Sequence, residues 1–352
     1  MDRLLYGGKM EEKNIAVGIP CYAALPHLNY SLNSLMLQLN ASELTIILSF
    51  DNDPTEAATR EWVETIYKPY FKSIVYISGT ERLGPGGNRN RILEWVYSHP
   101  IDYIAFMDQD DSLWSISTIK NLYEALFDDQ GEQLYPASNG TLLEECAAGL
   151  IEIGNHHQTW VHGKLFDVAF LKKWDIWFPK TTNEDLGFSN LVTMYCNDKQ
   201  AYVPDAVYCW RNNRSSLSRS DSYYFRESFM GFVETKCWCY EHIEKHMNAD
   251  CARAYAMASL PHIYYLSFSF DEKLPKEYHE KAKFYIAKFV FYCAAEQALE
   301  STDTWHKLLY TNINSDEAKN LAYGNAITQS YEDWIKYYSH YQPFLEAIKP
   351  NV

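Results

Sequence analysis

The sequence has 352 residues, of which 47% are hydrophobic and 22% are charged, and this composition excludes an intrinsically disordered chain. Acidic residues outnumber basic residues by 46 to 31, which gives a formal net charge of −15. A broad basic surface for phosphate backbones is therefore excluded, and we expect no nucleic acid among the partners.

The apolar runs of the sequence are short. None approaches the ~20 residues that a membrane-spanning helix needs. The start of the chain also lacks the apolar region of a secretory leader. The cysteines show no disulfide-like spacing, which is typical of reduced thiols. We therefore predict a cytoplasmic protein without a transmembrane segment, which could work at the inner face of the membrane.

Residues 14 to about 127 alternate short apolar runs with helical patterns, and this alternation predicts parallel strands joined by helices. The runs are mainly apolar, which is typical of strands covered on both faces. They span residues 15–19, 44–48, 73–77 and 103–107. A helix is expected after each of the first three runs, and the third helix should follow Gly84-Pro85-Gly86-Gly87.

The rest of the chain has a different pattern. Residues 128–220 mix turn signals with short elements, whereas helical patterns dominate from Tyr223 onward. We predict an α/β fold with a Rossmann-like, mixed but mostly parallel sheet and flanking helices, followed by a helical C-terminal domain. The expected parts are an N-terminal extension at 1–13, an α/β domain at 14–220 and the helical domain at 221–352.

The run at 103–107 ends in an acidic cluster that contains Asp108, Asp110 and Asp111. In an open α/β sheet, ligands bind beyond the carboxyl ends of the strands. Adjacent carboxylates repel one another unless a cation neutralises them, and hard oxygen ligands suit Mn²⁺ or Mg²⁺. We therefore predict a divalent-cation site that faces substrate phosphates. The alternative is a solvated turn in which Asp111 or Ser112 caps the next helix.

Two further segments carry candidate chemistry. The segment Gly84–Arg91 opens a helix whose first N–H groups could face an anion, and Arg89 or Arg91 could add charge-assisted bonds. The alternative is a plain loop-to-helix junction. The acids Glu184 and Asp185 stand at a predicted helix start, where they either complement the helix dipole or line a pocket that needs a general base.

Together these segments resemble the family 2 glycosyltransferases, inverting enzymes of the GT-A fold that use nucleotide-diphosphate sugars. The resemblance covers roughly residues 14–220 and rests on several motifs in the family's order. The matching segments are Pro20-Cys21-Tyr22, Ser49 to Asp53, Gly84 to Arg91, Asp108 to Asp111, His162 to Phe166, Phe178-Pro179 with Glu184-Asp185, Tyr208 to Arg211, and Ser215 to Ser218.

The resemblance implies a role for each matching residue. Asp110 would ligate Mn²⁺ or Mg²⁺, with Asp111 as a further ligand candidate. Asp185 would be the catalytic base, and Glu184 would bind the acceptor or orient the site. The implied nucleotide-sugar contacts are Pro20, Tyr22 and Asp51 for the nucleoside, Arg89 for the base or diphosphate, Asp108 for the ribose or sugar, and Arg211, Arg214, Ser216 and Ser218 for the diphosphate.

Some aromatic, histidine and cysteine residues are weaker candidates. Trp114, beside the acidic cluster, and His162 could contact the acceptor, although structural hydrogen bonding explains His162 equally well. Cys239, His242 and His246 share one helical face and could bind zinc. Because reduced cysteine and partly buried histidine are ordinary core residues, we favour a packing role for this group.

We therefore predict a glycosyltransferase of the hexosyltransferase class that acts in polysaccharide biosynthesis. It would move a sugar from a nucleotide-diphosphate sugar, with UDP as the default nucleotide, to a hydroxyl of a glycan, lipid-linked or polymer acceptor. The transfer would be a single, metal-assisted displacement that inverts the anomeric centre. The alternatives are a nucleotidyltransferase, a catalytically silent nucleotide-sugar-binding module and an interaction scaffold.

Overall fold

The computed structural model describes residues 13–146, 149–154, 159–211, 229–267 and 275–292, together with 336, 339–341 and 343. Contacts divide the chain into two compact units. The first unit consists of residues 1–180 and 188–213, and the second of residues 181–187 and 214–352. Because the expected boundary at 220 lies outside the described residues, the predicted domain limits stay a prediction.

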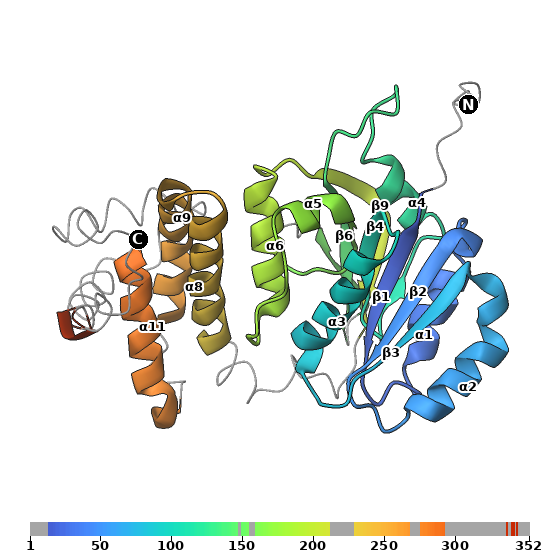
Figure 1. Ribbon diagram of the computed structural model, residues 1–352, viewed down its shortest axis with the longest axis horizontal. Helices are drawn as coiled ribbons and strands as arrows, with labels where there is room; N and C mark the ends of the chain where they lie inside the picture. Colours follow the sequence, from blue (N-terminus) through green and yellow to red (C-terminus); the bar gives the residue numbers. More distant parts are fainter. Residues whose placement is uncertain are drawn as a thin grey trace. The chain divides into compact units, whose positions relative to one another are not determined.

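Within the described residues, the first unit contains one nine-stranded mixed sheet (Figure 1). The strand order is β3-β2-β1-β4-β8-β6-β9-β5, and β7 pairs with β6. The strands are β1 Ile15–Cys21, β2 Leu44–Phe50, β3 Ser73–Ser78, β4 Tyr103–Phe106, β5 Ser112–Leu113, β6 Ala137–Cys146, β7 Gly149–Gly154, β8 Lys164–Asp167 and β9 Ala201–Trp210. The parallel pairs are β3-β2, β2-β1, β1-β4 and β6-β9, and the other four are antiparallel.

The helices of the first unit follow the predicted alternation. They are α1 Leu28–Met36, α2 Glu56–Ile66, α3 Gly84–Ser98, α4 Thr118–Glu124, α5 Val168–Lys173 and most of α6 Glu184–Tyr195, with 3₁₀ turns at Ala41–Glu43 and Lys68–Tyr70. Helix α3 begins at Gly84 itself rather than after Gly87. Pro85 fits there because the first turn of a helix needs no N–H donor at that position.

Helices on both sides explain why β1 is apolar along its length. Val17 belongs to a core cluster that also contains Leu32 and Leu35 of α1. On the opposite face, α3 packs on β1, and a Cβ atom placed on Gly18 would lie only 2.7 Å from Cγ2 of Ile92. The glycine therefore lets α3 approach the strand closely.

The second unit is helical within its described residues (Figure 1). It contains α8 Phe229–His246, α9 Ala249–Ser267, a 3₁₀ turn at Lys276–Tyr278 and α11 His279–Tyr292. Helices α9 and α11 both pack against α8. No helix in the described ranges is long and apolar enough to cross a membrane.

The predicted fold class is confirmed. The chain combines a mixed sheet and flanking helices with further helices towards its C-terminal end. The parallel order holds through β1 to β4, where apolar runs alternate with helices. Beyond β4 the sheet contains both parallel and antiparallel pairs. The strands of this part include β5, which directly follows the acidic cluster.

Candidate active site

The acidic cluster forms a turn, residues 108–111, between β4 and β5. We call it the acid turn. It lies at the carboxyl edge of the parallel strands, where β1 also ends. Gln109 fixes it there, because its Oε1 accepts from the N–H of Tyr22 at 2.9 Å and its Nε2 donates to the Tyr22 carbonyl at 2.9 Å. No role was predicted for Gln109, since nothing in the local pattern indicates its partner.

Asp108 is ion-paired with Arg89 of α3. Nη2 of Arg89 donates to Oδ1 of Asp108 at 2.6 Å. Arg89 is buried, whereas a third of the Asp108 side chain is exposed. Burial opposes ionisation of Asp108, but the Arg89 cation, aided by His162, holds the pKa of Asp108 below its ordinary value. The structure thus places Arg89 against the acid turn, and its predicted contact with the base or diphosphate stays a prediction.

Asp111 is directed into the protein and is only 1% exposed. Its Oδ2 accepts from the hydroxyl of Tyr208 at 2.6 Å, and its Oδ1 accepts from the N–H of Arg211 at 2.9 Å. Burial raises the pKa of Asp111 well above its ordinary value, and the charges of Asp108 and Asp110 raise it further. These contacts give Asp111 a structural role and leave Asp110, which is half-buried, as the stronger candidate metal ligand.

Asp51, which follows β2, holds the start of α3. Its two oxygens accept from the N–H groups of Leu83 and Gly84, each at 2.8 Å, and Arg91 donates to Oδ1 at 2.9 Å. Asp51 is buried. The carboxylate is thus engaged by the chain itself, and the predicted contact of Asp51 with a nucleoside remains untested.

Tyr22 offers an accessible aromatic surface at the end of β1. Its side chain is 38% exposed, whereas Pro20 is half-buried. The guanidinium carbon of Arg82 lies 3.7 Å from the centroid of the Tyr22 ring, which is a close cation–π contact. Arg82 was missed by the sequence analysis because it lies outside the glycine-rich segment.

Arg211 marks the end of β9. Its guanidinium carbon lies 3.4 Å from the centroid of the Tyr30 ring, and its Nε is 3.6 Å from Oε2 of Glu145. Its main chain is joined to the acid turn through Asp111. The other predicted diphosphate contacts, Arg214, Ser216 and Ser218, lie outside the described residues.

The two predicted acceptor-side residues have opposite environments. Trp114 is 60% exposed just beyond the acid turn. His162 is buried and stacks on Tyr208, with 4.8 Å between ring centroids and 22° between ring planes. The structure therefore places His162 beneath the acid turn, in a packing environment, and leaves Trp114 accessible to a ligand.

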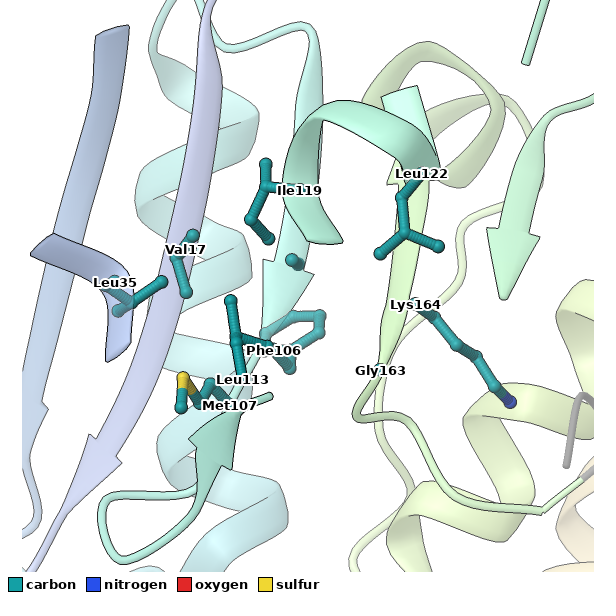
Figure 2. A pocket seen from close by; sticks show the side chains of 10 residues that line it. Val17, Leu35, Phe106, Met107, Leu113, Ile119, Leu122, Gly163 and Lys164 are labelled. Atoms are coloured by element: carbon teal, nitrogen blue, oxygen red, sulfur yellow. The ribbon is translucent and has the colours of Figure 1, made fainter. Parts of the chain in front are cut away.

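A small cavity lies behind the acid turn (Figure 2). Met107 and Leu113, which flank the turn, line it together with other apolar side chains. Lys164 also borders it, but its Nζ points away and donates to Ser189 of α6 at 3.2 Å. With this apolar lining, the cavity is a packing defect of the core and offers no place for a nucleotide.

Glu184 and Asp185 form the first turn of α6. They belong to segment 181–187, which is part of the second unit. Thr235 of α8 anchors this segment, because its Oγ1 lies 2.5 Å from Oγ1 of Thr181 and 3.4 Å from the carbonyl of Asn183. The acid turn belongs to the first unit, so the predicted convergence of the two acidic groups stays a prediction.

The cysteine–histidine group on α8 has the environment of a helical core. Cys239 is fully buried, and burial raises its pKa to about 11. Cys237 is also buried, and burial raises its pKa well above the ordinary value. The rings of His242 and His246 stack at 4.4 Å. Buried cysteines of this kind are ordinary core residues, and a packing role for the group stays our prediction.

Comparison with known proteins finds a family match within the α/β part of the chain. Residues 16–137 match the model of the glycosyl transferase family 2. The expected resemblance is confirmed over this segment, which includes β1 to β4, α3 and the acid turn. No curated protein shows significant sequence similarity to the chain.

Solved structures share the fold over nearly the whole chain. S. aureus TarS 1–349 in complex with UDP-GlcNAc has a TM-score of 0.65 and 16% identity, covering 94% of this chain and 92% of that one. The same segment in complex with UDP has a TM-score of 0.62 and 16% identity, covering 94% and 91%. A longer S. aureus TarS structure has a TM-score of 0.56 and 17% identity, and the match covers 93% of this chain and 55% of that one. At such identities the likeness shows the fold alone.

Proposed function

We propose that this protein is an inverting glycosyltransferase that uses a nucleotide-diphosphate sugar, with a UDP-sugar as the expected donor. The observation that carries the proposal is the acid turn. Asp108 is kept ionised beside Asp110 at the carboxyl edge of a parallel sheet, within the segment that matches the glycosyl transferase family 2. The UDP and UDP-GlcNAc complexes of the similarly folded TarS support UDP as the nucleotide.

The nucleotide would bind along this edge of the sheet. The exposed ring of Tyr22, which also contacts Arg82, gives a flat surface on which a base can stack. Arg211 begins the segment that we expect to contact the diphosphate. Trp114, exposed beyond the acid turn, is the expected contact for the acceptor.

The oxygen ligands of the acid turn suit Mn²⁺ or Mg²⁺. Asp110 would hold the ion, with the exposed part of Asp108 beside it, and the ion would supply positive charge to the diphosphate. Arg89 keeps Asp108 ionised by offsetting part of the negative charge of the turn.

On the acceptor side, we propose that Asp185 removes the proton of the attacking hydroxyl. Glu184 would bind the acceptor or orient Asp185. A hydroxyl held in line with the anomeric carbon displaces the nucleotide in one step, which inverts that centre. The acceptor would be a glycan, a lipid-linked saccharide or another polymer in polysaccharide synthesis.

A screen of nucleotide sugars tests the proposal. The full chain should release UDP from one UDP-sugar in the presence of Mn²⁺ or Mg²⁺. Asp110→Asn should reduce this release at least ~100-fold, because a bound metal ion contributes several kcal/mol to catalysis. Asp129→Asn, which changes an exposed acid, is the matched control. Release of pyrophosphate from nucleoside triphosphates would instead establish a nucleotidyltransferase.

The base is tested with an acceptor mixture. Asp185→Asn should lower the rate of sugar transfer by ~10²–10⁴-fold, since a general base contributes that much. Binding of the UDP-sugar, measured by calorimetry, should be unchanged. Transfer at the wild-type rate would refute the assignment of Asp185, whereas donor binding without transfer by the wild-type chain would indicate a silent binding module.

A further inference from the structure

Tyr208 of β9 contacts both ends of the acid turn. Its hydroxyl accepts from the N–H of Asp108 at 3.1 Å and donates to Oδ2 of Asp111 at 2.6 Å. One phenol oxygen therefore bridges the residues on either side of Asp110. Only folding brings these residues together, since Tyr208 lies 100 positions from Asp108 and 97 positions from Asp111 in the chain.

The ring of Tyr208 is fixed in place. The side chain is only 1% exposed, and the His162 ring stacks on it at 4.8 Å. Pairing of β5 with β9 sets Leu113 opposite Tyr208. Because the ring is packed on both the sheet and His162, the sheet determines the position of its hydroxyl, and that hydroxyl holds both ends of the acid turn.

The same contacts extend to Arg211, the residue that follows β9. Asp111, held by the Tyr208 hydroxyl through Oδ2, accepts from the N–H of Arg211 through Oδ1 at 2.9 Å. The metal-binding turn and the start of the proposed diphosphate segment are thus joined by one buried carboxylate.

We propose that Tyr208 is a positioning residue that holds Asp110 for a divalent cation through its bonds to Asp108 and Asp111. This inference rests on the proposed function, because it concerns the metal site of that reaction. Residues that orient metal ligands typically contribute ~10–100-fold to metal affinity. Tyr208 itself contacts neither the metal nor the donor in this proposal.

The test measures Mn²⁺ affinity directly, by electron paramagnetic resonance of free Mn²⁺, with the full chain and saturating UDP. Tyr208→Phe keeps the ring and removes the hydroxyl, so it should weaken Mn²⁺ binding about 10-fold. In a sugar-transfer assay the half-saturating Mn²⁺ concentration should rise by the same factor, with kcat recovered at high Mn²⁺. A variant that is merely less stable would lose kcat without this shift.

Tyr202→Phe is the matched control, since Tyr202 lies on the same strand and is exposed. It should bind Mn²⁺ as the wild type does. If the Tyr208→Phe variant binds Mn²⁺ with unchanged affinity, the inference about Tyr208 is overturned and the proposed metal site is not. Absence of Mn²⁺ binding by the wild type would overturn both the inference and the proposed metal site.

The wild-type chain gives a second measurement if the variant does not fold. Amide hydrogen exchange should slow together at 107–113 and at 208–211 when Mn²⁺ and UDP are added, because Tyr208 and Asp111 couple the two segments. Slowing at 107–113 without any change at 208–211 would overturn the inference.

Discussion

Buried and partly buried charges in this protein differ in the groups that surround them. Asp108 has the guanidinium of Arg89 at 2.6 Å, so it stays ionised. Asp111 has hydroxyl and amide donors, but burial, and then the two acids nearby, make its charge costly. Lys236 of α8 is buried against the rings of Phe232 and Tyr255, at 5.4 and 5.1 Å. Burial lowers the pKa of Lys236 to about 8, against a smaller opposing effect of Cys239.

The Lys236 amine predicts a specific pH dependence of stability. Because its folded-state pKa is lowered to about 8 from 10.5, the unfolded chain binds the proton more tightly between these values. The free energy of unfolding should therefore rise as the pH increases from about 8 towards 10.5. Lys236→Met should abolish this rise, because methionine carries no titratable group.

Urea unfolding at several pH values measures this effect. Lys245→Met changes an exposed lysine on the same helix and should leave the pH dependence as it is in the wild type. Parallel pH profiles for the wild type and Lys236→Met would show that Lys236 keeps an ordinary pKa.

At the scale of elements, the site depends on how closely α3 approaches the sheet. The helix carries Arg89, which reaches Asp108, and its first residues are held by Asp51. Gly18 in β1 makes the approach possible, since a side chain there would meet Ile92. A displaced helix would shift Arg89 relative to the acid turn.

Gly18→Ala should therefore destabilise the protein by about 1–3 kcal/mol, the usual cost of overpacking a core. Ile92→Ala alone should also destabilise it, by removing buried contacts. The double variant should be more stable than the sum of the two effects predicts, because the smaller residue relieves the overlap. Thermal and urea unfolding measure the coupling, and strict additivity would show that Gly18 does not set the packing of α3.

At the scale of the whole molecule, the chain assigns its two acidic groups to different units. The acid turn belongs to the sheet unit, whereas segment 181–187, with Glu184 and Asp185, belongs to the helical unit. Within that unit, Thr235 and Gly231 of α8 face the segment, and a Cβ atom on Gly231 would lie 1.8 Å from Oγ1 of Thr182. The helical unit thus contributes to the proposed acceptor side through α8.

Thr235→Val tests this contribution. It keeps the volume of the side chain and removes its hydrogen bonds to Thr181 and Asn183, at a cost of about 1 kcal/mol in stability. We expect sugar transfer to fall while the dissociation constant for the UDP-sugar is unchanged. Thr65→Val, at an exposed position of α2, should affect neither. Equal losses in donor binding and transfer would contradict an acceptor-side role for α8.

Local patterns were sufficient for the first half of the fold and for the location of the acid turn. The runs at 15–19, 44–48, 73–77 and 103–107 form β1 to β4, because an apolar run of this length bounded by turn residues favours a buried strand. The order of β8, β6, β9 and β5 was not predictable. Their partly polar sequences do not specify a neighbour, so pairing depends on the packed sheet.

The sequence by itself determined which residues carry the candidate chemistry: the acids near 110 and 185, the glycine-rich helix start and the family resemblance. Only the tertiary structure decided what each of them contacts. Asp51 and Asp111 are the same residue type in loops that follow strands of the same sheet, yet one holds α3 and the other joins Tyr208 to Arg211. Such partners lie far apart in the chain, and the free energy of their contacts depends on burial and on geometry that exists only once the sheet has formed.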